Sequence, residues 1–119
     1  MSDRWIVHKF GGSSLAGSRE FSRVADIVSN GDQRRRAVVV SAPAGVTDRL
    51  LELLEPDTPI EGRIDRLRAD LDVLLGDLLD GDDRSAALDA LDRDLDTIRA
   101  VLASTRLLRS VPPEARSLV

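Results

Sequence analysis

The chain has 119 residues, of which 42% are hydrophobic and 32% charged, which suits one globular domain and leaves no room for two. It has no run of about twenty apolar residues, and we expect no signal peptide, no membrane partner and a cytoplasmic location. Cysteine is absent, which excludes a disulfide framework, a thiolate zinc site and a cysteine nucleophile.

The charge balance excludes a further class of function. Seventeen basic residues against twenty-one acidic ones give a net charge of -4, and only 3% of the residues are aromatic. Such a chain has neither the positive surface nor the stacking side chains of a nucleic-acid binder, so we expect no nucleic-acid partner. Sixteen of the cations are arginine, which makes Lys9 the only lysine.

The first half of the chain predicts a strand, a glycine turn, a helix and a second strand. Residues 5–8 (Trp-Ile-Val-His) form a short apolar run that stops at a Gly-Gly-Ser-Ser turn. Apolar residues at helical spacing then predict a helix over Ser18–Ser29, with Ser18 as its N-cap. Residues 37–40 (Ala-Val-Val-Val) lack polar alternation, which is typical of a parallel strand covered on both faces. The unit is therefore a βαβ crossover, for which a right-handed connection is expected.

The second half of the chain changes to helical periodicity. A short helix is predicted over residues 47–55 and is ended by Pro56. Residues 58–61 (Thr-Pro-Ile-Glu) form a capping box with proline at the first helical position, and they open a longer helix that Gly81 closes.

A further long helix is predicted to start near Asp82 or Asp83 and to run to about Arg109. The short connection between the two long helices predicts an antiparallel hairpin. Each helix carries a seam of large apolar residues, which fits a hairpin core better than a coiled-coil partner surface: Ile60, Ile64, Leu67, Leu71, Leu74 and Leu78 on the first, and Leu88, Leu91, Leu95, Ile98 and Leu102 on the second. Residues 112–119 are expected to begin another helix.

Aspartates are concentrated on the outer faces of both long helices. They lack the loop glycine and the clustered ligands of a calcium loop, so solvated helix surfaces are favoured and no metal site is predicted. These residues are Asp70, Asp72, Asp77, Asp80, Asp89, Asp92, Asp94 and Asp96.

The glycine turn after the first strand is the best candidate for a phosphate-binding loop. Gly11 and Gly12 let backbone amides approach a bulky anion. Ser13 and Ser14 add hydroxyl donors, and the start of a helix adds a positive dipole end. Lys9 supplies a mobile charge suited to phosphate. The pattern is neither a Walker P-loop nor a GxGxxG motif, and a purely structural turn is the alternative.

The loop after the second strand is expected to lie beside the first, because parallel strands end at the same edge of a sheet. Ser41 and Thr47 offer hydroxyl groups there, and Ala44 and Gly45 keep the backbone accessible. Thr47 also fits the N-cap of the following helix, and the two roles are compatible.

Two segments, HKFGGSSLAGSREFSRVADIV and VVVSAPAGVTDRLLELL, together resemble the start of an aspartokinase, a member of the amino-acid kinase fold. They occur in the family's order and at its separation, and the helical region to about Val111 is similar to the excursion that follows them. The implied fold class is α/β: the N-terminal portion of the Rossmann-like, parallel-sheet amino-acid kinase fold, with a helical hairpin. Serine at position 13, where other aspartokinases have threonine, resembles the bifunctional aspartokinases that are fused to homoserine dehydrogenase or diaminopimelate decarboxylase.

The resemblance implies transfer of the γ-phosphoryl group of ATP, accompanied by Mg²⁺, to the side-chain carboxylate of L-aspartate. The product is 4-phospho-L-aspartate, which leads to lysine, threonine and methionine. By position, Lys9 would be the catalytic residue and would bind phosphate together with residues 11–14. Ser41 and Thr47 would contact the substrates, whereas Asp48 stands where the family often has asparagine. Such a reaction needs positioning and electrostatic stabilisation.

The resemblance covers the whole chain but only part of the family's catalytic domain. It implies a partial amino-acid kinase domain over residues 1–119, with the βαβ unit and its loops in 1–55, the hairpin in 56–111 and the start of a helix in 112–119. In the family, a Gly-Glu segment that helps to hold aspartate follows just beyond. We therefore expect an N-terminal piece that is inactive alone, holds no cofactor tightly and self-associates. The alternative is a non-catalytic binding or assembly module that uses the leucine-lined hairpin.

Overall fold

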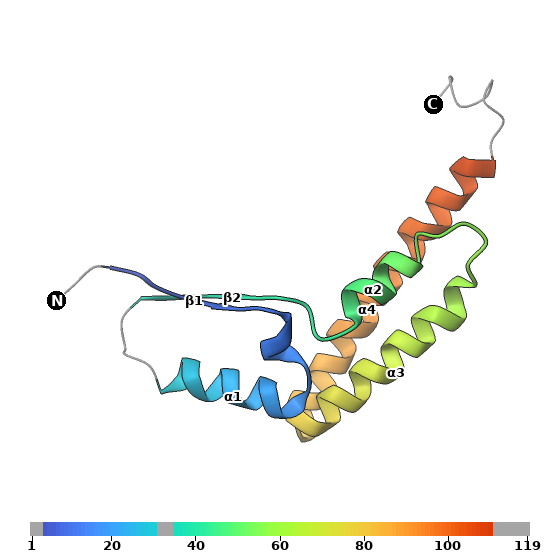
Figure 1. Ribbon diagram of the computed structural model, residues 1–119. Helices are drawn as coiled ribbons and strands as arrows, with labels where there is room; N and C mark the ends of the chain where they lie inside the picture. Colours follow the sequence, from blue (N-terminus) through green and yellow to red (C-terminus); the bar gives the residue numbers. More distant parts are fainter. Residues whose placement is uncertain (1–3, 31–34, 111–119) are drawn as a thin grey trace.

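The computed structural model describes residues 4–30 and 35–110 of the chain. In Figure 1, the strands and the helix between them, residues 6–40, lie on one side, and the helices of residues 46–110 lie on the other. The molecule measures 63 × 34 × 26 Å, and its radius of gyration is 19.0 Å. A compact chain of this length would have a radius of about 13.5 Å, so the molecule is elongated. Its elements are β1 (Ile6–Phe10), the 3-10 helix η1 (Gly12–Leu15), α1 (Ser18–Ser29), β2 (Arg36–Val40), α2 (Val46–Glu52), α3 (Ile60–Leu78) and α4 (Gly81–Ser110).

β1 and β2 pair in parallel, with α1 between them in the chain. Lys9 pairs with Val39 and Phe10 with Val40. β1 therefore extends two residues beyond the predicted strand, because Lys9 and Phe10 also pair with β2. The predicted order of strand, helix and parallel strand is confirmed.

The helix α1 covers one face of this small sheet (Figure 1). Arg36, at the start of β2, donates a hydrogen bond to the carbonyl of Val28 in α1. Along β1, exposed and half-buried side chains alternate, with Val7 and Lys9 on the exposed side. The apolar run in β2 predicts cover on both faces, yet Val38, Val39 and Val40 are 43%, 50% and 56% exposed. The described residues do not supply that cover.

Two helices begin differently from their predicted starts. Ser18 is the first residue of α1, and Gly17 occupies the N-cap position without a side-chain hydrogen bond. Thr47 lies inside the first turn of α2, whose N-cap is Gly45. The N-cap predictions for Ser18 and Thr47 are therefore wrong. The helix α2 also ends at Glu52, three residues before its predicted end.

The capping box predicted at the start of α3 does not form. Pro59 occupies the N-cap position, and no side chain caps the helix. Thr58 is buried, and its carbonyl accepts a hydrogen bond from Arg106 of α4. The carboxylate of Glu61 accepts a hydrogen bond of 3.1 Å from Arg99 of α4. The contact with Arg99 thus takes the Glu61 carboxylate that a local capping box would have used.

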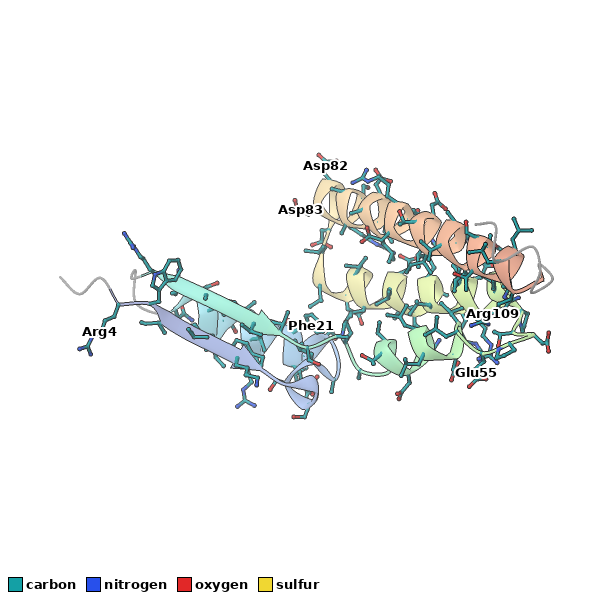
Figure 2. The ribbon with its side chains drawn as sticks, turned by 90° about the horizontal axis from the view of Figure 1, so that it is seen from above. Arg4, Phe21, Glu55, Asp82, Asp83 and Arg109 are labelled. Carbon is teal, nitrogen blue, oxygen red and sulfur yellow. The ribbon has the colours of Figure 1, made fainter. Side chains whose placement is uncertain are left out.

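The helices α3 and α4 form the predicted antiparallel hairpin (Figure 1). Gly81 begins α4 with a φ of 51°, whereas the sequence predicts that it closes α3. Figure 2 shows Asp82 and Asp83 at the turn of the hairpin, and Arg109 at its other end near Glu55. The helix expected within residues 112–119 lies outside the described residues.

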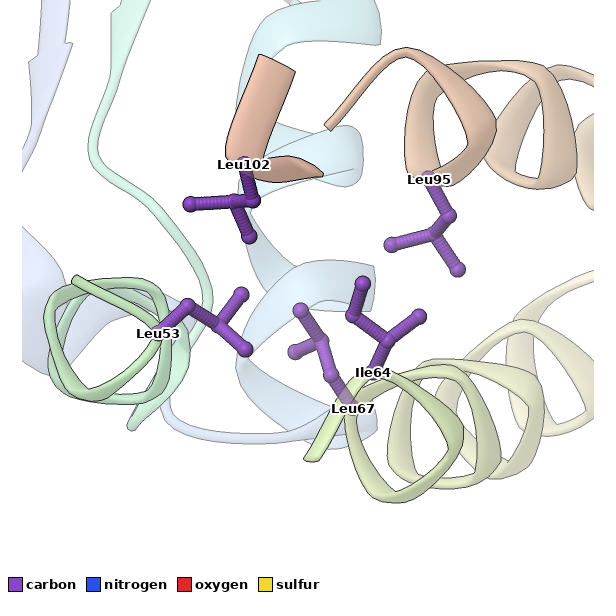
Figure 3. Packing of buried hydrophobic residues seen from close by; sticks show 5 residues of the cluster. All are labelled: Leu53, Ile64, Leu67, Leu95 and Leu102. Atoms are coloured by element: carbon purple, nitrogen blue, oxygen red, sulfur yellow. The ribbon is translucent and has the colours of Figure 1, made fainter. Parts of the chain in front are cut away.

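A hydrophobic core fills the space between α2, α3 and α4. Figure 3 shows its buried side chains converging from the end of α2 and from both long helices. Each such side chain stabilises the fold by roughly 1.5–3 kcal/mol relative to an exposed one. The prediction that the apolar seams form a hairpin core is confirmed. The buried members are Leu53, Ile64, Leu67, Leu95 and Leu102, and the half-buried residues packed against them are Val46, Ile60, Leu71, Leu91 and Ile98.

Arginine–aspartate pairs join α3 to α4 beside this core. Arg68 Nε lies 2.6 Å from one carboxylate oxygen of Asp92, and its Nη2 lies 3.2 Å from the other. This hydrogen bond, together with the arginine charge, lowers the pKa of the Asp92 carboxyl. Arg84 bonds Asp72 at 2.9 Å. Part of the predicted solvated aspartate surface is therefore engaged between the helices.

Candidate phosphate-binding site

The loops that follow β1 and β2 lie side by side at one edge of the sheet. The N–H of Ser41 donates to the carbonyl of Phe10 at 3.1 Å, and the N–H of Ala44 donates to the carbonyl of Leu15 at 3.3 Å. A Cβ atom placed on Gly12 would lie 3.9 Å from Ser41 Oγ. Backbone hydrogen bonds thus hold Ser41 against the first glycine loop.

Lys9 lies one residue before the end of β1 and is exposed. Its position in the alternating pattern places it with Val7, on the face opposite α1. Within residues 4–30 and 35–110, no carboxylate forms an ion pair with Lys9. Its ammonium group is therefore available to an anionic ligand beside the loop.

The Gly-Gly-Ser-Ser segment forms a single 3-10 turn, in which the N–H of Ser14 donates to the carbonyl of Gly11 at 3.0 Å. Gly11 has a φ of -77°, a conformation that any residue adopts. A Cβ on Gly11 would meet no atom within 4 Å. The two glycines are therefore not required by the turn or by packing. What they leave is open space next to the backbone, which suits close approach of an anion.

The positive helix end belongs to α1, which begins at Ser18 as predicted and so follows Ser14 by four residues. The helix that starts at Gly12 is one turn long, and α1 begins only at Ser18. Ser13 is exposed and Ser14 is half-buried, so hydroxyl groups remain beside the glycines. Amides and hydroxyl groups, rather than a helix dipole, are what this loop offers to a ligand.

The two predicted substrate contacts, Ser41 and Thr47, lie at opposite ends of the loop that leads into α2. Gly45 has a φ of 81°, which side chains rarely adopt, and it turns the chain into α2. Thr47 then lines an apolar groove between α2 and α4, beside Leu50 and Val101. The structure brings Ser41 to the glycine loop and leaves Thr47 at the groove.

Sequence reasoning missed Leu15, which links the two loops. Its side chain is only 2% exposed, and its carbonyl accepts the hydrogen bond from Ala44. The signal in the sequence is a large apolar residue directly after the polar Gly-Gly-Ser-Ser turn, because leucine is most often buried.

Metal-ligating side chains do not converge within the residues that the structure describes. Among them, no group of three or more His, Cys, Asp or Glu side chains is placed to hold a metal ion. In the same part of the chain, none of the helices has the length and apolar character that crossing a membrane requires.

Comparisons with known proteins find similar sequences and a similar fold. The profile of the amino acid kinase family matches residues 4–109. A bifunctional aspartokinase/homoserine dehydrogenase 2 of Arabidopsis thaliana, a chloroplastic protein, is 35% identical over 107 residues, which cover 84% of this chain and 11% of the relative. The aspartokinase resemblance of the two motifs is thereby confirmed.

Solved structures of Escherichia coli aspartokinase III match the fold. Its complex with lysine and aspartate has a TM-score of 0.68 and 32% identity, covering 87% of this chain. Its complex with aspartate and ADP has a TM-score of 0.67 and 32% identity, covering 85%. The expected α/β fold class is confirmed. This chain spans 11% of the length of the curated relative and 22% of each solved chain.

Proposed function

The chain belongs to the amino acid kinase family, and from this premise we propose that it forms the phosphate-binding part of an aspartate kinase. The whole enzyme would transfer the γ-phosphoryl group of ATP to the side-chain carboxylate of L-aspartate and release 4-phospho-L-aspartate, toward lysine, threonine and methionine. The observation that carries this proposal is the position of Ser41 beside Gly12, next to the exposed Lys9 near the end of the adjoining strand. A similar solved protein holds aspartate and ADP.

In this reaction Lys9 would be the catalytic residue. Its ammonium group stabilises the negative charge on the transferring phosphoryl group. The amides of residues 11–14 and the hydroxyl groups of Ser13 and Ser14 hold the phosphate oxygens in position. Mg²⁺ accompanies ATP and shields part of the phosphate charge. No covalent intermediate on the protein is needed, because positioning and electrostatics supply most of the catalysis.

Ser41 is the better supported of the two substrate contacts. It lies against Gly12, so its hydroxyl group can donate a hydrogen bond to ATP or to aspartate at the same edge of the sheet. Thr47 remains in the proposal as a second contact, although its place beside the apolar groove gives it less support.

The catalytic role is tested in a chimera in which this chain replaces the matching segment of E. coli aspartokinase III. We expect Lys9→Ala to lower kcat for aspartate-dependent ADP release by about 10²–10³-fold, as loss of one charge-stabilising donor does elsewhere. Arg93→Ala, which removes an exposed cation from α4, is the matched control and should leave kcat unchanged. Lys9→Ala with more than a tenth of the parental kcat would contradict the role.

The 119-residue chain by itself is expected to show no turnover, because it spans 22% of the solved relative's chain. A coupled ADP-release assay checks this expectation. Aspartate-dependent turnover that disappears in Lys9→Ala would show instead that these residues make a complete site.

We also propose that the isolated chain resides in the cytoplasm, where ATP is supplied, and that it self-associates. Support for association comes from exposed apolar side chains on both parts of the molecule, such as Val7, Val39 and Leu51. Pairing of a second copy with β2 or over the helices would cover them. Sedimentation equilibrium should give a mass above the 13.0 kDa of one chain at micromolar concentration. A monomer across that range would contradict association.

A further inference from the structure

A cavity of about 520 Å³ lies between α2 and the beginning of α3. None of its lining residues belongs to the candidate phosphate-binding site. Half of them are arginines, and a single carboxylate faces them. The lining residues are Arg49, Glu52, Pro59, Gly62, Arg63 and Arg66.

On each helix, the lining residues are spaced so that they share one face, and this face lines the cavity. Arg49 and Glu52 are three residues apart on α2, and Arg63 and Arg66 are three residues apart on α3. Residues at this spacing are neighbours on a helix surface. The turn between the helices thus brings two polar faces together around one space.

The ion pairs around the cavity leave positive charge uncompensated. Glu52 is engaged by Arg63 at 3.0 Å. Arg49 pairs with Asp70 through its Nη1 atom. Arg66 forms no ion pair or hydrogen bond through its side chain within residues 4–30 and 35–110. Two carboxylates, Glu52 and Asp70, therefore face three arginines, and an added anion would balance the remaining positive charge.

The start of α3 adds backbone donors to the same space. Pro59 and Gly62 both line the cavity, and no side chain caps this helix. The first N–H groups of a helix have no partner within it and carry partial positive charge. A Cβ on Gly62 would meet no atom within 4 Å, so the glycine leaves room beside those amides.

We propose that this cavity binds a phosphate group, either as free phosphate or as part of a small phosphorylated molecule. Guanidinium groups match phosphate oxygens with paired hydrogen bonds, and Arg66 is the lining arginine whose guanidinium group has no partner within residues 4–30 and 35–110. The volume falls within the range of small-molecule sites and exceeds what one phosphate ion needs. This site is separate from the Lys9 loop, so it goes beyond the proposed kinase function.

The test is an NMR titration of the ¹⁵N-labelled 119-residue chain with inorganic phosphate and, in parallel, glycerol 3-phosphate, at constant ionic strength. The amides of Gly62, Arg63 and Arg66 should shift and saturate. Stronger binding of glycerol 3-phosphate identifies a phosphorylated molecule as the ligand, and equal binding identifies free phosphate. Shifts at residues 11–14 report the Lys9 loop independently, so failure of one site is distinguishable from failure of the other.

Two matched pairs of variants decide whether the cavity is responsible. Arg66→Gln should weaken phosphate binding at least fivefold, whereas Arg93→Gln, with the same loss of charge on exposed α4, should not. Gly62→Leu should abolish the saturable shift by filling the space, whereas Gly62→Ala should retain it. Shifts that never saturate, equal effects of the two arginine variants, or full binding by Gly62→Leu would each overturn the proposal. Circular dichroism melts of all four variants confirm that they are folded.

Discussion

The sheet region and the helical region of this molecule are held together in different ways. In the helical region, five buried side chains form a continuous core, and arginine–carboxylate pairs join α3 to α4. In the sheet region, from β1 to β2, Leu15 is the one buried hydrophobic side chain among the described residues, and the valines of β2 are exposed. Figure 2 shows the two regions meeting at a narrow junction. The region that carries the candidate site is therefore the one with less core of its own.

This contrast has a consequence for ligand binding. Lys9, Gly11 and Ser13 are exposed, and the groups that hold their loop in place are mainly backbone hydrogen bonds to the neighbouring loop. Exposure leaves the loop accessible to a ligand, while the helical region supplies stability. Loss of core packing should therefore unfold the chain, whereas changes on the open sheet should affect binding more than stability.

The largest expected effect is on the helical core. Ile64→Ala removes a fully buried side chain and should lower the free energy of unfolding by about 2–5 kcal/mol. Val39→Ala, at a half-exposed position of the sheet, should lower it by no more than about 0.5 kcal/mol. Urea denaturation followed by circular dichroism measures both. Equal losses would mean that the sheet carries as much of the stability as the hairpin.

A smaller effect is expected at the junction between the two regions. Gly45 has a φ of 81°, so Gly45→Ala should destabilise the chain by about 1–2 kcal/mol. Gly11→Ala is the matched control, because Gly11 has a φ of -77° and open space around it, and its stability should hardly change. Urea denaturation of the two variants compares them directly. A costly Gly11→Ala would show that the first loop also depends on glycine for its conformation.

The sequence predicts the strongly patterned elements of both regions. The hairpin follows from its periodicity, because Ile64, Leu67 and Leu95 recur at the spacing that one buried helix face requires. The parallel strands follow from two short apolar runs around a helix. In both regions, the strongly patterned elements were predictable because each residue in the pattern has the same environment.

The helix starts and the site details were less predictable, because tertiary contacts decide them. Arg99 of α4 binds the Glu61 carboxylate that a capping box at Thr58 would have used. The left-handed backbone of Gly45 starts α2 one residue early and carries Thr47 to the apolar groove. The contact of Arg99 with Glu61 has no local signal, because the two residues are 38 positions apart in the sequence.

The smallest expected effect concerns the ion pairs of the hairpin at low pH. Arg68 lowers the pKa of Asp92 below its ordinary value of 3.8, so the pair stabilises the fold when the carboxylate is ionised. That contribution is present above the ordinary pKa and is lost as the pH falls through the lowered one. Asp92→Asn should therefore lower Tm slightly at pH 7 and make its decline in acid shallower.

Thermal melts between pH 2 and pH 7 measure this effect. Asp94→Asn is the control, because Asp94 is an exposed aspartate of the same helix. If Tm depends on pH in the same way in Asp92→Asn and Asp94→Asn, the ion pair of Asp92 with Arg68 adds no specific stabilisation.

The most direct test of the phosphate-binding role is an NMR titration of the ¹⁵N-labelled chain with Mg²⁺ and ADP. The amides of residues 11–14 and of Ser41 should shift first and together, because the two loops lie against each other. Lys9→Ala should weaken those shifts, and Arg93→Ala should not. Shifts confined to the arginine cluster at residues 34–36, with the loop amides unmoved, would contradict the proposed site.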